Sequence, residues 1–399
     1  MPRKFYSTNP LPFFCWICGG HLHSDDDWQL GTPPLLVSEK EEWQQIWKQH
    51  ARWKRTRNRP FAIHLPASEL SMAFQQQKGW YHLFRMILEK ADESPCRPSY
   101  SLSGIGDMDG ARAPHRLFFV PLDPEMAYIG CPGHKTARIA VVARIPHPSR
   151  AHDIDDDDDD DDDGDDPALK GYLLHARCWD LLERQLGSRA TQQLDYILAA
   201  LKKFWSQEGA LEIPRLIYQG LIDFTGKPIF MESQRSVTGG VIVPYPGIDD
   251  PFHIPAVNEL LHRSRVRGEE GPVTALSSSS SSSVTAYLST RLSLPLEIKY
   301  AISDYLDATS VRNMLLAFGE SLPVSYWLHR IPTTLYMEIQ DKALTAPETI
   351  DWPYLTMMVN DKNILGDSLG IWNRSRILAI LTQVTEYVNE LDTLNGRAI

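Results

Sequence analysis

Cysteine is scarce in this chain, with only five residues among 399. So small and odd a number does not make a disulfide framework, and it indicates a reducing compartment in which thiols stay free or bind metal. Long apolar runs are missing too, and the N-terminal segment lacks the pattern of a secretory signal. We therefore expect a soluble protein of the cytoplasm or the nucleus, with no membrane span.

The familiar sequence signatures of enzymes are also absent. The chain contains no Gly-x-Ser-x-Gly elbow, no phosphate-binding loop and no dinucleotide-binding fingerprint. Its histidines and aspartates are scattered, and their spacing assigns them no catalytic partnership. The sequence thus favours a protein that is not an enzyme, and an enzyme built on an unfamiliar fold is the alternative.

A surplus of positive charge is lacking as well. The formal net charge is −11, but twelve aspartates lie in the single stretch 153–166, and without them the chain would carry +1. Such a run of like charges cannot pack and is predicted to be a disordered insertion. The nearly neutral remainder gives no support to a nucleic-acid-binding surface.

Two pairs of residues have the chemistry and spacing of metal ligands. Cys15 and Cys18 form a Cys-x-x-Cys sequence followed by two glycines, which permit the tight turn of a zinc knuckle. His175 and Cys178 are three positions apart, which on a helix places both on the same side of one turn. Together the pairs would supply a closed, structural zinc site. A redox dithiol is the alternative for the first pair, and simple core packing for the second.

A third pair, Cys131 and His134, has the spacing of half a metal site but no second half of its own. It could join or replace the other ligands. The apolar segments on either side of this pair, 117–120 and 138–145, are predicted to be buried strands.

Apolar spacing predicts the other elements. Within 80–88, and again within 191–205, apolar residues recur at helical intervals and predict two helices. Nearly all of 291–391 has the spacing of helices, whereas 1–257 has a mixed pattern. The predicted fold class is therefore α+β and mostly helical, with a zinc staple in the mixed region.

Composition predicts four parts. The first, 1–257, is the mixed α/β region with both ligand pairs and the acidic insertion. Residues 258–290 contain seven consecutive serines and are predicted to be a flexible linker. Residues 291–330 form a helical hairpin with its continuation, and 331–399 form a C-terminal helical region.

The hairpin at 292–318 consists of two short amphipathic helices. Pro295 stands in the first turn, where proline sacrifices no hydrogen bond. Ile298, Ile302 and Tyr305 follow on one face, and Ser310 is predicted to cap the second helix. Two such helices cannot bury both apolar faces alone, so they need a third helix or a partner.

The order of residues in this hairpin resembles the F-box. The matching positions are Leu294, Pro295, Glu297, Ile298, Ile302, Leu306, Val311 and Met314. The continuation to Trp327 resembles that of uncharacterised fungal F-box proteins, and so does the Gly171-Tyr-x-x-His-x-x-Cys-Trp segment after an N-terminal Cys-x-x-Cys. One departure is the sequence Glu320-Ser-Leu-Pro, which replaces the basic, serine-rich end of the usual third helix.

The resemblance implies a partner and a role. The eight matching residues would dock on the Skp adaptor of a Skp–cullin–F-box ubiquitin ligase, and through it on a cullin. The chain would then hold an unknown protein substrate near the transfer machinery, whose other subunits perform the chemistry. No recruitment repeat indicates which substrate. The alternative is a zinc-stabilised scaffold or nucleic-acid-associated protein in which the hairpin belongs to the core.

Overall fold

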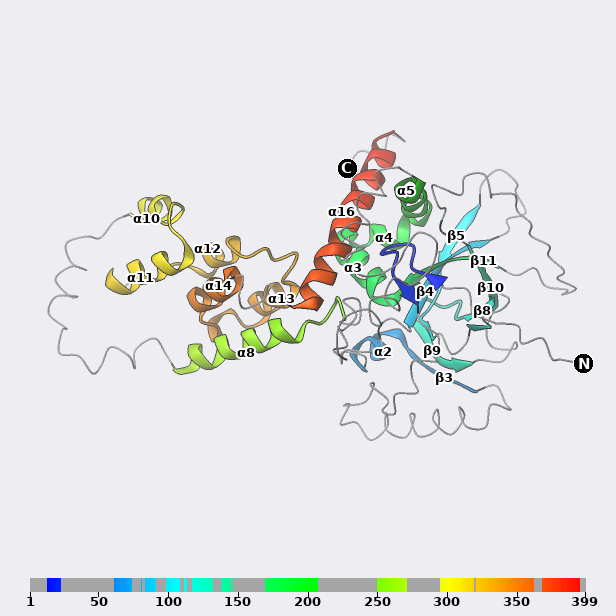
Figure 1. Cartoon of the computed structure of the whole chain (residues 1–399), viewed down its shortest axis with the longest axis horizontal. Coiled ribbons are helices and arrows are strands. Elements are labelled where there is room, and N and C mark those ends of the chain that lie inside the picture. The colour runs from blue at the N-terminus through cyan, green and yellow to red at the C-terminus, as the bar shows by residue number, and fades with distance from the viewer. Residues whose placement is uncertain are drawn as a thin grey trace, which may run out of the picture. The chain divides into compact units, whose positions relative to one another are not determined.

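The computed structural model forms two compact units. Unit 1 comprises Met1–His253 and Asn373–Ile399, and unit 2 comprises Ile254–Trp372. The described residues are 13–22, 61–73, 80, 83–90, 98–107, 111–112, 117–131, 138–143, 145, 169–206, 250–270, 295–318, 321–361 and 368–394. Helices and strands both occur in unit 1, and the C-terminal region is helical, which confirms the predicted α+β, mostly helical class (Figure 1).

Unit 1 is built on a seven-stranded sheet. The strand order is β5 (Ser99–Leu102), β4 (Leu83–Lys90), β11 (Leu169–His175), β10 (Arg138–Val142), β8 (Leu117–Val120) and β7 (Ala111–Arg112), with β6 (Gly106–Asp107) paired to β4. β10 and β11 run parallel, and the other pairs are antiparallel. The predicted strands at 117–120 and 138–145 are confirmed, the second of them as Arg138–Val142.

Two small two-stranded sheets accompany the large one. β3 (Phe61–Pro66) pairs with β9 (Met126–Cys131), and α2 (Ala67–Ala73) follows β3 directly. β1 (Phe13–Phe14) pairs with β2 (His21–Leu22) and encloses a tight turn. The Trp16 amide in that turn donates to the Leu173 carbonyl at 2.8 Å, which fastens the N-terminal hairpin to the central strand β11.

Among the described residues of unit 1, four helices besides α2 accompany the sheet. They are α3 (Ala176–Leu186), α4 (Arg189–Gln192), α5 (Leu194–Ser206) and the part of α16 (Leu369–Leu394) from Asn373 onward. Lys203 on α5 pairs with Glu390 at 2.7 Å, and Arg189 pairs with Asp392. The C-terminal helix is thereby attached to elements almost 200 residues earlier. α5 confirms the helix predicted within 191–205.

The chain leaves unit 1 after His253 and returns to it at Asn373, and side-chain contacts within unit 1 hold both of these segments in place. Just before His253, the Asp250 carboxylate accepts a hydrogen bond from Arg177 Nε at 3.1 Å, and both side chains are almost fully buried. Just after the chain re-enters, buried Arg374 donates to the Pro251 carbonyl. The outgoing and returning segments therefore lie next to each other.

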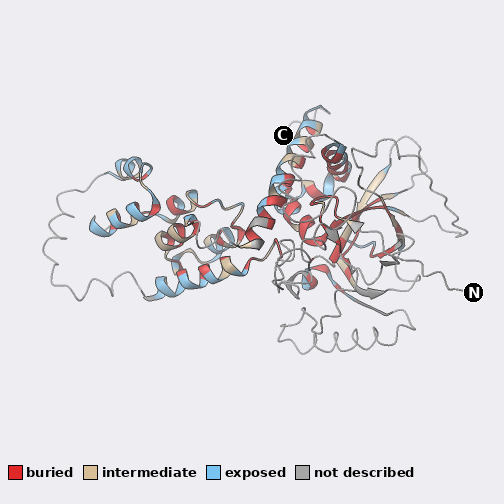
Figure 2. Ribbon diagram, in the orientation of Figure 1, coloured by how far each residue is buried: buried red, intermediate tan, exposed pale blue. Residues whose placement is uncertain are grey.

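Unit 2 is helical throughout its described residues. Its elements are α8 (Pro255–Glu270), α10 (Leu296–Ser303), α11 (Ala308–Phe318), α12 (Val324–His329), α13 (Met337–Thr345), the short 3₁₀ helix η7 (Pro347–Thr349) and α14 (Trp352–Asn360). Their core includes Val257, Val311, Trp327, Ile339 and Leu355, each at most 1% exposed. Much of α10 and α11 is exposed (Figure 2).

One predicted helix is a strand. Residues 83–90 form β4 and hydrogen-bond to β11 on one side and to β5 on the other. Leu83, Phe84, Met86, Ile87 and Leu88 are all buried. A central strand covered on both faces carries a nearly continuous apolar run, which does not reveal by spacing whether it is helix or strand. The helix predicted within 80–88 is therefore wrong.

The predicted linker also needs correction. Its first part, 258–270, lies within α8, and only 271–290 falls outside the described residues. α8 buries Val257, Leu260 and Leu261 in the core of unit 2 and carries exposed charges on its other face. Those charges made the segment resemble a linker.

The predicted C-terminal part, 331–399, is also divided, because the boundary between the two units lies between Trp372 and Asn373. The acidic insertion lies outside the described residues.

Candidate metal centre

The first two candidate ligands lie in the turn between β1 and β2. The Cys15 amide donates to the Gly20 carbonyl at 2.9 Å, and the Gly19 amide donates to the Cys15 carbonyl at 2.8 Å. Gly19 adopts φ +64°, a left-handed conformation that glycine adopts readily. The turn directs the Gly20 amide toward Cys18 Sγ at 3.3 Å. The two glycines thus form the predicted tight turn, in which a backbone amide donates to the Cys18 sulfur.

The second pair lies where β11 passes into α3. His175 is the last residue of the strand and the N-cap residue of α3, and Cys178 lies in the first turn. The prediction that both stand on one helical turn is therefore wrong for His175, because a strand delivers it to the site. Its backbone amide donates to Cys15 Sγ at 3.2 Å, so the junction touches the knuckle directly.

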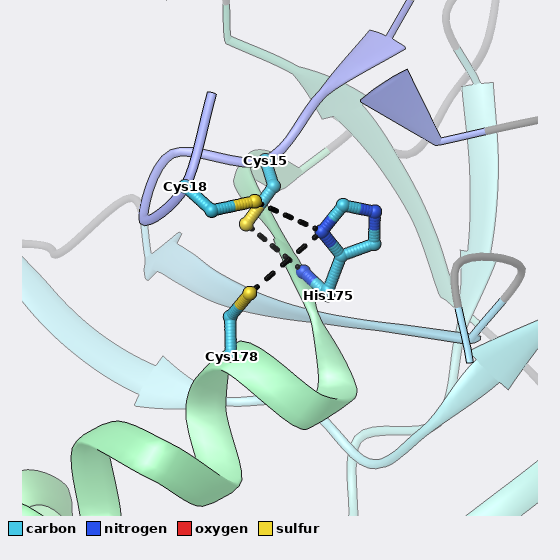
Figure 3. A group of neighbouring side chains, drawn as sticks. All are labelled: Cys15, Cys18, His175 and Cys178. Atoms are coloured by element: carbon cyan, nitrogen blue, oxygen red, sulfur yellow. Dashed lines mark hydrogen bonds between the residues drawn. The ribbon is translucent and has the colours of Figure 1, made fainter. Parts of the chain in front are cut away.

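The structure brings these four side chains together (Figure 3). Their ligand atoms all lie within 4.8 Å of one another, and all four residues are buried. His175 Nδ1 is 3.3 Å from Cys18 Sγ and 3.8 Å from Cys178 Sγ. Ligands held tetrahedrally at zinc–sulfur and zinc–nitrogen distances of about 2.0–2.3 Å would be about 3.3–3.8 Å apart. The cluster thus has the composition and nearly the spacing of a closed metal site.

The charges in the cluster depend on one another. Burial opposes the charged form of His175, but the Cys18 and Cys15 sulfurs outweigh burial and raise the pKa of the imidazole to about 10. Burial likewise opposes the Cys18 thiolate, yet hydrogen bonds from Cys15 and Cys178 and the His175 charge hold its pKa well below the usual value. Burial and the neighbouring thiols raise the pKa of Cys178. Without metal, these shifts favour the charged forms of His175 and Cys18 together.

Three further side chains enclose the site. The Trp80 ring lies 4.7 Å from the His175 ring, centroid to centroid. Trp205 Nε1 donates to the Trp16 carbonyl at 2.6 Å, and Arg376 Nη1 donates to the Cys18 carbonyl at 2.7 Å. Sequence reasoning did not assign these residues to the site, because nothing in their spacing points to the knuckle. All four candidate ligands are buried, and four protein ligands would fill a tetrahedral coordination sphere, which is typical of a structural site.

The alternatives for the ligand pairs can be compared with this geometry. Cys15, Cys18 and Cys178 are free thiols with no exposed surface. A redox dithiol needs an accessible sulfur, so the burial of the Cys15–Cys18 pair argues against that alternative. Cys131 ends β9, while His134 lies outside the described residues. Among the residues that the structure describes, the only cluster of metal-binding side chains is the one at Cys15, Cys18, His175 and Cys178.

The predicted docking residues of unit 2 fall into two groups. Pro295, Glu297, Ile298 and Ile302 are exposed, Ile298 at 46% and Ile302 at 40%. Leu306 and Met314 are half-buried against the core, and Val311 is completely buried. Leu294 lies outside the described residues. The exposed group belongs to α10, whereas Val311 on α11 packs in the core of unit 2 and is not available to a partner in this structure.

Two local predictions in the hairpin are wrong. Tyr305 follows the end of α10 and is 91% exposed, so it does not continue the apolar face of that helix. Ser310 does not cap α11, which begins earlier, at Ala308. Asp307 takes that role by accepting a hydrogen bond from the Ser310 amide at 2.6 Å, and these amide bonds lower the pKa of its carboxyl group.

Comparisons of the chain with protein-family models, with curated proteins and with solved structures found no match. Within the described residues, no helix has both the length and the apolar character required to cross a membrane. The interpretation of function therefore depends on the two local features above, the buried cysteine–histidine cluster in unit 1 and the exposed face of α10 in unit 2.

Proposed function

We propose that the cluster in unit 1 binds a structural zinc ion. Three sulfur donors and one imidazole nitrogen form a typical ligand set for tetrahedral zinc. The contact between Cys18 Sγ and His175 Nδ1 joins the two pairs across 157 residues of sequence. An ion held there joins the N-terminal hairpin to the central strand, so the free energy of metal binding becomes free energy of folding.

Metal analysis of the purified full chain tests this proposal. We expect about one zinc ion per chain, and near-complete loss after Cys15→Ser combined with Cys178→Ser. A zinc content near zero in the wild type, or one that the double substitution leaves unchanged, would contradict a zinc site at these residues. His64→Gln serves as the control, because His64 is an exposed imidazole on β3 that does not belong to the cluster.

We further propose that the chain is an F-box-type adaptor, which docks on Skp through unit 2 and presents a protein substrate to the ligase. The observation that supports this proposal is that one helix of the hairpin is buried in the core whereas the other exposes apolar side chains. α11 is anchored in the core by Val311 and Leu315, while α10 keeps Ile298 and Ile302 exposed at the positions that match the motif. An amphipathic helix with a free apolar face suits a helical groove on a partner.

The expected energetics are those of a small apolar contact. Full burial of an isoleucine side chain contributes about 1.5–3 kcal/mol, so two that are about half exposed would contribute about 1 kcal/mol each. Exposed Pro295, the N-cap residue of α10, precedes them and would extend the same contact. The chain itself supplies no catalytic group in this scheme, and its effect is to raise the local concentration of substrate.

A pull-down with purified Skp tests the adaptor proposal. We expect the wild-type chain to retain Skp, and the double variant Ile298→Asp with Ile302→Asp to lose it. The matched control is Leu344→Asp, because Leu344 is an exposed apolar residue of the same unit on another helix, α13. No Skp on the wild type, or equal retention by all three chains, would exclude docking through α10.

The second candidate is a zinc-stabilised scaffold with no ligase role, including one that associates with nucleic acid. The observation that favours it is the burial of Val311 and Leu315, which makes the hairpin a part of the core of unit 2. On this alternative, α10 is a peripheral helix without a partner. The same pull-down distinguishes the two, since a scaffold retains no Skp in any of the variants.

A further inference from the structure

One buried cation contacts the knuckle from a distant part of the chain. Arg376, on α16, is 5% exposed and donates from Nη1 to the Cys18 carbonyl at 2.7 Å, across 358 residues of sequence. Its Nη2 donates to Asn373 Oδ1 at 3.0 Å. Both recorded partners are uncharged, and within the described residues Nε is buried without a hydrogen-bond partner. A guanidinium removed from water needs a counter-charge, and no described carboxylate pairs with it.

The proposed metal centre supplies a charge of the required sign. Its three cysteines bind metal as thiolates, and the imidazole binds in its neutral form. With a divalent ion the centre keeps one net negative charge, in a place where all four ligands are buried. A buried charge of this kind is costly unless a charge of opposite sign lies nearby.

We propose that Arg376 is a positioning residue of the metal centre, which balances its negative charge and fixes the peptide that carries Cys18. This inference rests on the proposed zinc site. It assigns to α16 a role in metal retention, in addition to its packing in unit 1.

The path from the guanidinium to the sulfur is short. Arg376 holds the carbonyl of the Cys18–Gly19 peptide, and Gly19 then turns with φ +64°. The turn brings the Gly20 amide to Cys18 Sγ at 3.3 Å, where it stabilises the thiolate. Release of the carbonyl would let the peptide rotate and would misalign that amide. Partners of this kind, one bond removed from a ligand, typically contribute 10–100-fold to metal affinity.

The coupling must act in both directions. If Arg376 strengthens metal binding, then bound metal strengthens the attachment of α16 at Arg376 by the same free energy. Metal removal is therefore expected to increase amide hydrogen exchange in α16 near Arg376. The far end of the helix, held by Asp392 and Glu390, should change less.

Zinc release from the full-length chain tests the inference. The zinc-loaded wild type, Arg376→Met and Arg376→Lys would be mixed with excess chromogenic chelator, and the release rate recorded. The control is Arg374→Met, because Arg374 is an equally buried arginine two positions away that contacts the Pro251 carbonyl. We expect about 10–100-fold faster release from Arg376→Met, an intermediate rate from Arg376→Lys, and a wild-type rate from Arg374→Met.

A second readout separates positioning from general loosening of the helix. The rise in Tm that zinc produces should be smaller in Arg376→Met than in the wild type and unchanged in Arg374→Met. Equal release rates for the two methionine variants, or a wild-type rate for Arg376→Met, would overturn the inference. If Arg376→Met does not fold, the zinc-release rates of Arg376→Lys and Arg374→Lys are compared instead, and equal rates would overturn the inference. A wild-type chain that holds no zinc would instead refute the zinc site itself, and this inference with it.

Discussion

Alanine at Gly19 is expected to destabilise unit 1 much more than alanine at Gly187. Both glycines have nearly the same backbone conformation, with φ +64° and φ +61°. An L-residue in this conformation costs about 1–2 kcal/mol. A Cβ at Gly187 would meet nothing within 4 Å, but one at Gly19 would lie 2.7 Å from Trp205 Cη2. Crowding of a packed core adds about 1–3 kcal/mol, which gives about 2–5 kcal/mol for Gly19→Ala.

The assay is urea unfolding of the zinc-loaded full chain, followed by tryptophan fluorescence. Gly20→Ala completes the series, because its Cβ would lie 3.1 Å from Cys18 Sγ without a positive φ. We expect this variant to release zinc faster while losing less stability than Gly19→Ala. If Gly19→Ala and Gly187→Ala cost the same free energy of unfolding, the turn is not packed against Trp205, and the reasoning about an enclosed knuckle is refuted.

Two further predictions follow from buried charges. Zinc binding at pH 7.5 should release two or more protons, among them those of the His175 imidazolium and the Cys178 thiol, because both pKa values are raised without metal and both ligands bind deprotonated. Zinc affinity should therefore fall as the pH falls, and calorimetry in two buffers of different ionisation enthalpy counts the protons; a count near zero would contradict the charge assignment. Arg177→Met should cost about 3–5 kcal/mol in urea unfolding, because it leaves the Asp250 carboxylate buried without its partner. Much of that loss should be regained when Asp250→Leu is added, and a loss below about 1 kcal/mol would show that the pair is not buried in solution.

The cysteine–histidine cluster was accessible to sequence reasoning because its chemistry is rare. Few residue types bind soft metals, so Cys15, Cys18, His175 and Cys178 could be matched across 157 residues by type and spacing. Spacing alone did not reveal that His175 ends a strand. Arg376 was beyond reach, because an arginine on an amphipathic helix usually lies in solvent, and only the folded chain brings it to the Cys18 carbonyl.

The sequence predicted a helix or strand correctly where one face of the element is exposed to solvent, because the apolar residues then recur with a clear period. The helix within 191–205 follows from local pattern, because its buried apolar residues recur at helical intervals. β4 was missed because neighbours cover both its faces, which removes the alternation that marks a strand. The assignment of α16 to unit 1 was missed for another reason, since packing partners 200 residues away leave no local trace.

The order of the two units along the chain bears on how the protein forms during synthesis. Unit 2 is continuous, so Ile254–Trp372 can fold as soon as it leaves the ribosome. Unit 1 cannot be completed then, because Arg376 and the helix after it have yet to emerge. If the cluster binds zinc as we propose, a nascent chain could already hold the ion at the four ligands, but without the contact from Arg376 to the Cys18 carbonyl. Capture of the metal and its firm retention would thus be separated in time by the translation of the whole of unit 2.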